Sequence, residues 1–273
     1  MNVDLHCHTN LSDGALDPRV LVDLAVQRRV DMLAITDHDS IACYQQISRS
    51  TGDIQIITGI ELSTTWRNRG IHIVGLNMDL ENTGLLQGVN RQSRARAERS
   101  QKIAEKLQSF GFENCLAGAE KYTEGGQIGR PHFARYLVEI GAATNVQQAF
   151  KRYLGAGRAG DIKQQWADLE QVISWIRDAG GVAVLAHPTK YNMTRTKLSE
   201  LLAEFVALGG EGMEVISGSQ TPSVTQSMAR LCQQFGLLAS CGSDFHSPQQ
   251  PWAALGKVPA LPSHCVPVWS RWA

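Results

Sequence analysis

The segment Val3–His8, with the sequence VDLHCH, decides the fold, because it predicts a β-strand that ends in a pair of histidines. Asp17 and Pro18 come next; Asp is favoured at the N-cap of a helix and Pro in its first turn. The same order of a short apolar run and then an amphipathic stretch recurs along the chain. This alternation is typical of βα units around a parallel sheet or barrel.

Seven apolar runs rich in strand-forming residues predict seven strands, one fewer than the common eight-stranded βα barrel has. They are Val3–His8, Met32–Thr36, Gln55–Glu61, Ile71–Leu76, Val182–Ala186, Gly212–Ile216 and Leu237–Ser240. The polar segment 64–70 is short enough for a hairpin between two of them. Helices are expected over about Asp168–Asp178, Lys197–Leu208 and Ser223–Phe235.

From about residue 83 to residue 160 the strand signal disappears, and polar residues recur with helical periodicity. Ile103 and Leu107, for example, fall on one face of such a helix. We therefore predict a barrel formed by residues 1–82 and 161–273, with residues 83–160 as a helical insertion that caps it. The insertion is rich in basic residues that alternate with acidic ones, so a solvated helix face is favoured over a nucleic-acid strip. These basic residues are Arg91, Arg94, Arg96, Arg99 and Lys102.

Composition limits the class of protein. The chain has 273 residues and 43% hydrophobic content, enough for a large buried core. Lys+Arg and Asp+Glu both number 26, so no net field draws the protein onto long DNA or a membrane. The six cysteines are scattered without a C-x-x-C pair, which indicates reduced thiols. Neither a leader nor a membrane-length apolar run is evident, so we expect a cytoplasmic protein.

Histidines and carboxylates gather where the predicted strands end. His6 and His8 are two residues apart, so on a strand both face one ion while Cys7 points to the other face. Mixed imidazole and carboxylate ligands suit Mn, Zn or Fe. A single such histidine would more often be structural, but nine candidates in order indicate two to three divalent ions, because one ion needs three or four ligands. The candidates are His6, His8, Asp13, His38, Glu61, His72, His187, Asp244 and His246.

The chain resembles the polymerase and histidinol phosphatase (PHP) superfamily. The resemblance is carried by His6-x-His8, Thr36-Asp37-His38-Asp39, Gly59-Ile60-Glu61, Ala186-His187-Pro188 and Gly242-Ser243-Asp244-Phe245-His246. It implies a distorted seven-stranded TIM-like barrel with a trinuclear metal site, most often of Mn. It also implies one ion on His6, His8, Glu61 and Asp244, a second on Glu61, His72 and His187, and a third on Asp13, His38 and His246.

Within that superfamily the chain looks closest to enzymes that dephosphorylate nucleoside 3',5'-bisphosphates, some of which also trim short RNA from its 5' end. The resemblance implies hydrolysis of the 3'-phosphate, with a metal-bound hydroxide attacking phosphorus. Asp37 and His246 are candidates to assist proton transfer, although a metal-bound histidine is not a free acid. For Asp37 a role in orienting a ligand is the alternative.

Substrate capture requires cations near the mouth of the barrel. Guanidinium groups match the geometry of phosphate, so the insertion supplies the first candidates, with the structural alternative of a salt bridge to the barrel. The candidates are Arg130, His132 and Arg135, followed by Lys163 and Lys190. Most tryptophans are expected to pack in the core, although an aromatic side chain at the mouth can stack on a base.

Three functions compete at this point. The first is removal of the 3'-phosphate from nucleoside 3',5'-bisphosphates, with 5'-3' exonuclease action on short RNA. The second is a phosphatase of another small metabolite such as histidinol phosphate, and the third is a non-catalytic metal-binding module. The expected partner is a small nucleotide or short RNA, with no long DNA and no membrane, and the oligomeric state is open.

Overall fold

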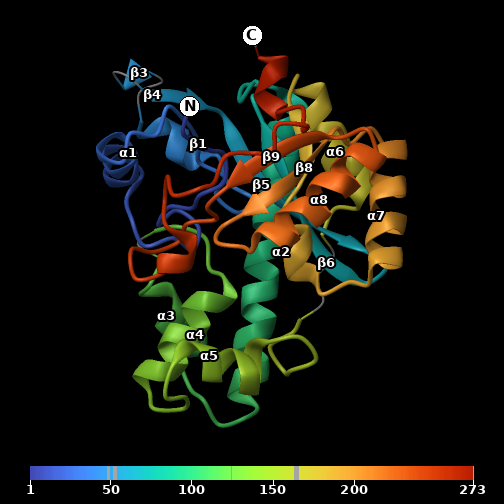
Figure 1. The fold of residues 1–273 in the computed structure, drawn as a ribbon. Helices are drawn as coiled ribbons and strands as arrows, with labels where there is room; N and C mark the ends of the chain where they lie inside the picture. The colour runs from blue at the N-terminus through green and yellow to red at the C-terminus, as the bar shows by residue number, and fades with distance from the viewer. Residues whose placement is uncertain (48–49, 52–53, 124, 163–165, 273) are drawn as a thin grey trace.

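The computed structural model describes residues 1–47, 50–51, 54–123, 125–162 and 166–272. Their strands form two sheets (Figure 1). The first has the order β1-β2-β4-β3 and the second the order β5-β6-β7-β8-β9. The strands are β1 (Val3–Asp4), β2 (Met32–Ala34), β3 (Ser50–Thr51), β4 (Ile54–Ile57), β5 (Gly59–Trp66), β6 (Arg69–Leu76), β7 (Val182–Leu185), β8 (Gly212–Ser217) and β9 (Leu238–Gly242).

The mixed α/β class is confirmed. The strands of the described residues form two open sheets, and a closed seven-stranded barrel is not shown. The single strand predicted over Gln55–Glu61 is wrong: β4 ends at Ile57 in the first sheet and β5 begins at Gly59 in the second. Thr58 lies at the break, where its carbonyl accepts from Asn77 N at 2.7 Å. The chain therefore changes sheets at one residue, which no break in hydrophobicity marks.

Backbone hydrogen bonds join the two sheets at two places. Leu5 N, just after β1, donates to Cys241 O of β9 at 3.0 Å. On the other side, Asp39 N donates to Glu61 O of β5 at 2.9 Å, and His38 pairs with Glu61 in a parallel bridge. The segment after β1 therefore meets β9, and the segment after β2 meets β5.

The predicted hairpin is confirmed. β5 and β6 pair in antiparallel register from Gly59↔Leu76 to Trp66↔Arg69. Its turn consists of Arg67 and Asn68 alone, both with positive φ (46° and 63°), which is the geometry of the tight turns that suit strand twist. The hairpin places His72 opposite Ser63, two residues beyond Glu61.

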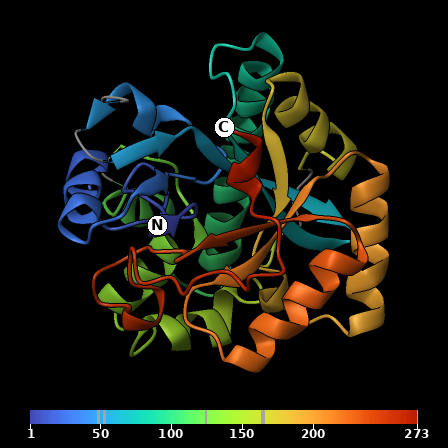
Figure 2. The same cartoon turned by 45° about the horizontal axis from the view of Figure 1, so that its top comes forward.

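Helices α6, α7 and α8 lie on the outer side of the second sheet and pack with its strands in one apolar core (Figure 2). Asp17 accepts from Arg19 N at 2.8 Å as the N-cap of the first helix, as predicted. Asp168 likewise caps α6. The helices outside the insertion are α1 (Pro18–Gln27), α6 (Leu169–Asp178), α7 (Arg195–Ala207) and α8 (Pro222–Gln234), with short 3-10 turns η1 (Ala42–Gln45), η3 (Pro188–Tyr191), η4 (Pro251–Ala253) and η5 (Val268–Arg271).

The predicted insertion, residues 83–160, contains the helices α2 to α5 among its described residues. Figure 1 shows α3, α4 and α5 below the sheets, with α2 running from the sheets to them. Leu85 of α2 packs in the main core, whereas Ile103 and Leu107 pack in a separate apolar cluster with Phe133 of α4. The elements are α2 (Thr83–Gln108), α3 (Cys115–Glu120), α4 (Arg130–Glu139), α5 (Val146–Ala149) and the π-helical turn η2 (Phe150–Leu154).

One basic residue of α2 departs from the expected solvated face. Arg96 is 7% exposed, and its guanidinium pairs with the buried carboxylate of Asp39 beside His38. Arg94 two residues earlier is exposed, as expected. Among the described residues, no helix is long and apolar enough to cross a membrane.

Candidate metal centre

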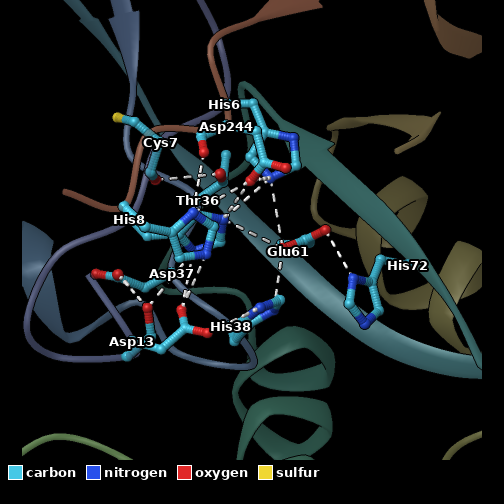
Figure 3. A network of polar contacts seen from close by, with 12 residues as sticks. His6, Cys7, His8, Asp13, Thr36, Asp37, His38, Glu61, His72 and Asp244 are labelled. Atoms are coloured by element: carbon cyan, nitrogen blue, oxygen red, sulfur yellow. Dashed lines mark hydrogen bonds and ion pairs between the residues drawn. The ribbon is translucent and has the colours of Figure 1, made fainter. Parts of the chain in front are cut away.

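Glu61 lies at the centre of a group of histidines (Figure 3). Its carboxylate is buried, and Oε1 lies 2.8 Å from His72 Nδ1 and 2.8 Å from His187 Nε2. The ring nitrogens around Oε2 belong to His38 at 2.9 Å, His8 at 3.3 Å and His6 at 3.4 Å. One carboxylate on β5, an edge strand of the second sheet, therefore faces five imidazoles from segments of both sheets.

Two aspartates extend the group on the side away from His72. Asp13 Oδ1 lies 3.3 Å from His246 Nε2, and Asp13 Oδ2 lies 3.7 Å from His38 Nε2. Asp244 Oδ1 lies 3.4 Å from His8 Nε2. Both aspartates are less than a tenth exposed. The centre thus combines carboxylate oxygens and imidazole nitrogens in one buried volume.

All nine predicted ligands take part in groups that could hold an ion. In each group the side chains bring one ligand atom each within 4.8 Å of one another. The groups are His8, Asp13, His38 and His246; His6, His187 and Asp244; His6, His8 and Glu61; and His38, Glu61 and His72. Some side chains, such as Glu61, belong to two groups, as expected where neighbouring ions share a ligand.

The unsatisfied atoms of the cluster fit a cation. Asp13 Oδ1, Glu61 Oε2 and His38 Nδ1 are buried and make no well-directed hydrogen bond among the described residues, although Glu61 Oε2 lies 2.9 Å from His38 Nδ1 and Asp13 Oδ1 lies 3.3 Å from His246 Nε2. Burying such acceptors without a partner costs several kcal/mol unless a cation compensates them. Burial alone would raise the pKa of Glu61, but the histidines around it, His72 first, hold that pKa well below its ordinary value. The donor set therefore suits divalent ions that take nitrogen and oxygen ligands.

The backbone places the ligands by close strand contacts and unusual dihedral angles. His8 N donates to Phe245 O at 2.9 Å, and Asp244 N donates to His6 O at 2.8 Å, so the two ligand segments run side by side. Asp244 and His187 adopt positive φ values of 53° and 27°. Such conformations cost about 1–3 kcal/mol each in non-glycine residues and persist where the surrounding structure enforces them.

Glu214 is a buried member of the site that the sequence analysis missed. Its Oε1 lies 2.5 Å from His6 Nδ1, and its Oε2 accepts from His187 N at 2.6 Å. Burial disfavours charge on His6, yet Glu214 and Glu61 together raise the pKa of its imidazole to about 10. Glu214 thereby fixes the ring of one ligand and the backbone of another. An acidic residue inside the apolar strand β8 was the signal that could have revealed it.

Asp37 points away from the imidazoles, toward the turn that carries Asp13. Its Oδ1 accepts from Thr9 N at 2.7 Å and from Ser12 Oγ at 2.6 Å, and its Oδ2 accepts from Thr9 Oγ1 at 2.6 Å. Burial raises the pKa of this carboxyl despite these donors. His246 is also engaged, since its Nδ1 lies 2.9 Å from Asp244 O.

The model of the PHP domain family matches residues 4–183. The chain belongs to this family. The matched region contains six of the nine ligand candidates, and His187, Asp244 and His246 follow in the later part of the chain.

Known proteins resemble this PHP chain along nearly its whole length. It is 44% identical to the 5'-3' exoribonuclease Rnm of Escherichia coli, over 98% of this chain and 93% of the relative. It is 38% identical to a 3',5'-nucleoside bisphosphate phosphatase of Chromobacterium violaceum, over 98% and 95%.

Two solved structures share the fold. An amidohydrolase from Chromobacterium violaceum, solved with bound sulfate and no metal, superposes with a TM-score of 0.93 at 38% identity and covers 99% of this chain and 95% of that one. The second is a protein from Bifidobacterium adolescentis, named as a metal-dependent phosphoesterase by inference. It superposes with a TM-score of 0.81 at 26% identity and covers 99% of this chain and 94% of that one.

The candidate phosphate-binding residues of this PHP domain occupy different surroundings. Arg130 is half-buried at the start of α4, with Nη1 3.8 Å from Asp161 Oδ1. His132 is buried; its Nδ1 accepts from Gly129 N at 2.9 Å, and desolvation lowers the pKa of the imidazole to about 4. Arg135 is half-buried one turn further along α4.

The two lysines named as lesser candidates also differ. Lys190 Nζ contacts Asp244 Oδ2, so this ammonium group lies at the edge of the ligand cluster. Lys163 lies outside the described residues.

Proposed function

We propose that this chain is a metal-dependent phosphoesterase that removes the 3'-phosphate from nucleoside 3',5'-bisphosphates and degrades short RNA from the 5' end. The observation that carries the proposal is the buried Glu61 carboxylate facing five imidazoles, with Asp13 and Asp244 beside it. Relatives named for these two activities share 38% and 44% identity over almost the full chain. Both activities break a phosphate ester, so one centre can serve both.

The proposed cofactor is two to three divalent ions, with Mn as the first choice and Zn or Fe as alternatives. The proposed ligands are His6, His8, Glu61 and Asp244 for one ion, Glu61, His72 and His187 for a second, and Asp13, His38 and His246 for a third. Bound divalent ions supply charge for the phosphoryl oxygens and lower the pKa of water to about 7.

The chain's own residues orient this set. Glu214 fixes the ring of His6 by a 2.5 Å contact to Nδ1, which leaves Nε2 directed at Glu61 and Asp244. We assign Asp37 a positioning role, because its three accepted hydrogen bonds hold the turn that presents Asp13. His246 serves as a ligand rather than a proton carrier, since Nδ1 is held by the Asp244 carbonyl and Nε2 faces Asp13.

A second, remote phosphate needs cations that the centre does not use. Arg130 is proposed for it, together with Arg99 of α2, because their guanidinium groups lie close enough to interact. Burial, followed by the charges of Arg130 and Arg96, lowers the pKa of Arg99 to about 9. Asp39 pairs with Arg96 and Asp161 lies beside Arg130, so two carboxylates face three arginines. The positive charge that remains can attract an anion. His132 would contribute as a neutral hydrogen-bonding group.

For the architecture, we propose that the two sheets act as one distorted barrel and that residues 83–160 cap its mouth. The hydrogen bonds from Leu5 to Cys241 and from Asp39 to Glu61 support the first part. The separate apolar cluster of the insertion supports the second, as does the 3.1 Å hydrogen bond from Gln127 Nε2 to Asp39 O.

The test is phosphate release by Mn-loaded protein from a panel that contains adenosine 3',5'-bisphosphate, adenosine 3'-monophosphate, adenosine 5'-monophosphate and histidinol phosphate. The bisphosphate is expected to give the highest kcat/KM. Arg130→Ala should lower that value by about 2 kcal/mol, roughly 30-fold, since it removes a charged contact to the remote phosphate. It should change kcat/KM for the 3'-monophosphate far less.

Arg152→Ala, an exposed arginine of the same insertion, is the control and should match the wild type. Equal activity on histidinol phosphate would instead assign the chain to a phosphatase of another metabolite. Equal losses on both nucleotides in Arg130→Ala would place Arg130 in the scaffold or at the reacting phosphate.

A further inference from the structure

A pocket of about 340 Å³ opens beside the metal centre. Its floor consists of three proposed ligands, Asp13, Asp244 and His246. Pro131 at the start of α4 lies on one wall, and the loops that follow β8 and β9 form the others. The volume falls in the range of small-molecule sites. A nucleotide whose phosphate is held at the centre would therefore have its remaining parts in this pocket.

Trp252 of η4 lines the pocket and is 59% exposed, although the sequence analysis expected it to pack in the core. The exposed indole is carried by a well-anchored backbone. Ser219 N donates to Trp252 O at 2.7 Å, and the next residue, Ala253, is buried. In Figure 1 the segment after β9, drawn in red, lies between α1 and the helices of the insertion. The ring is thus held at the rim of the pocket.

The loop after β8 is shaped to meet this segment. Gly218 has a φ of 61°, and a Cβ there would lie 3.0 Å from Trp252 O and 3.1 Å from Ser243 O. Only glycine combines this dihedral angle with so close an approach. The contact locks the position of Trp252 relative to Asp244, which follows Ser243 directly. The backbone of Trp252 is therefore fixed beside the candidate ligands, and its exposed indole lines the pocket.

Polar groups line the same pocket. Ser217 Oγ is buried and makes no hydrogen bond to any residue that the structure describes. Gln250 adds an amide, which can both donate and accept. A flat aromatic wall with donors and acceptors around it matches a nucleobase, which has an apolar face and a polar edge. A phosphate or a sugar alone requires no exposed indole.

We propose that Trp252 is the stacking wall of a nucleobase subsite, with Ser217 and Gln250 at the edge of the base. This inference rests on the proposed function, since a phosphate at the centre places the nucleoside in the pocket. Stacking accepts any base, because every base has a π-face. The subsite would therefore favour nucleotides over other phosphate esters without selecting one base.

Equilibrium binding tests the subsite apart from turnover. Calorimetry compares adenosine 5'-monophosphate with ribose 5-phosphate, which lacks the base, on the wild type, Trp252→Ala and Trp252→Phe. Trp252→Ala is expected to weaken binding of the nucleotide about 5- to 100-fold, the range for loss of one stacked base. It should leave the affinity for ribose 5-phosphate within about twofold, and Trp252→Phe should retain most of the nucleotide affinity. Phe110→Ala, an aromatic of similar exposure in the insertion, is the control and should match the wild type.

Kinetics provides the second arm, with adenosine 3',5'-bisphosphate set against 1-deoxyribose 3,5-bisphosphate. The same selective loss in kcat/KM is expected for Trp252→Ala. Equal losses with and without the base would show that Trp252 covers the sugar or phosphate, and no loss on either would make it a free surface residue; both results overturn the inference. Failure of the wild type to release phosphate from any bisphosphate would refute the proposed function, while the binding ratio would still decide the subsite.

Discussion

At the scale of single residues, the proposed metal centre depends on Glu61, whose carboxylate is shared among several imidazoles. Glu61 Oε1 and Oε2 face different imidazoles, so the carboxylate can contact cations on both sides of the centre. A carboxylate that bridges neighbouring cations keeps them close enough to act on one phosphate. Neutralising Glu61 while keeping its shape therefore isolates the contribution of its charge.

Glu61→Gln is expected to lower kcat/KM for phosphate release at least about 100-fold, because metal charge stabilisation contributes several kcal/mol. The variant should also bind fewer metal equivalents, as measured by elemental analysis after dialysis. Glu81→Gln, an exposed glutamate, serves as the control. Near wild-type kcat/KM in Glu61→Gln would remove Glu61 from the ligand set.

Glu214 acts through other residues, so its substitution should have a different signature. Glu214→Gln loosens His6 and the His187 backbone, and loss of such supporting contacts typically lowers metal affinity about 10- to 100-fold. Competition with a chelator measures this affinity, and excess metal should restore most of kcat. Glu211→Gln, which alters a half-buried glutamate paired with the exposed Arg271 just before β8, is the matched control. A loss of kcat that saturating metal leaves unchanged would contradict a positioning role.

Most of the candidate ligands could be picked out from the sequence, because they are histidines and carboxylates in or just after apolar runs, often close to one another along the chain. His6 and His8 also share a face by simple alternation. Glu214 escaped because it lies inside β8, between Met213 and Val215, and no histidine adjoins it in sequence. Its partners are 208 and 27 residues away, so only the folded chain brings them together.

At the scale of elements, α2 is the connection between the sheets and the insertion. Arg96 makes the central contacts of this connection. Its Nε donates to Asp39 Oδ2 at 3.1 Å, and its Nη2 donates to Ser63 Oγ at 3.1 Å. Gln92, one turn earlier, donates to Asp39 Oδ1 at 3.1 Å. The helix is thereby tied to the segment that presents His38, and the position of the insertion depends on this buried pair.

Arg96→Ala should destabilise the protein by about 3–5 kcal/mol, because it leaves the buried Asp39 carboxylate without its charged partner. Urea unfolding measures the free energy of unfolding. Arg94→Ala, on the exposed side of the same helix, should stay within about 0.5 kcal/mol of the wild type. Similar values for both variants would mean that the Arg96–Asp39 pair carries no net stability.

The elements were predictable where periodicity is strong and unpredictable where the chain changes partners. The helices around Asp168–Asp178 and Ser223–Phe235 appear close to the expected bounds, because their caps and apolar faces agree. The strand predicted over Gln55–Glu61 failed, since the apolar run continues through Thr58 while the backbone moves to another sheet. An apolar pattern records burial, and it does not say which sheet a strand joins.

At the scale of the whole molecule, the two sheets and the insertion converge on one buried centre. Its candidate ligands come from the first residues of the chain, from the segment after β2, from the β5–β6 hairpin and from the loops after β7 and β9. No short segment holds enough of them, so the centre exists only in the folded chain. The pocket beside it adds Trp252 and Pro131, which the sequence offered no way to place near one another.

The most direct test of the central claim is to identify the product when Mn-loaded protein is incubated with adenosine 3',5'-bisphosphate. Chromatography separates adenosine 5'-monophosphate from adenosine 3'-monophosphate, and released phosphate is measured in the same sample. The account predicts adenosine 5'-monophosphate and phosphate in equal amounts, with the reaction abolished by a chelator and restored by added Mn. Accumulation of adenosine 3'-monophosphate, or equal turnover in the presence of the chelator, would contradict it.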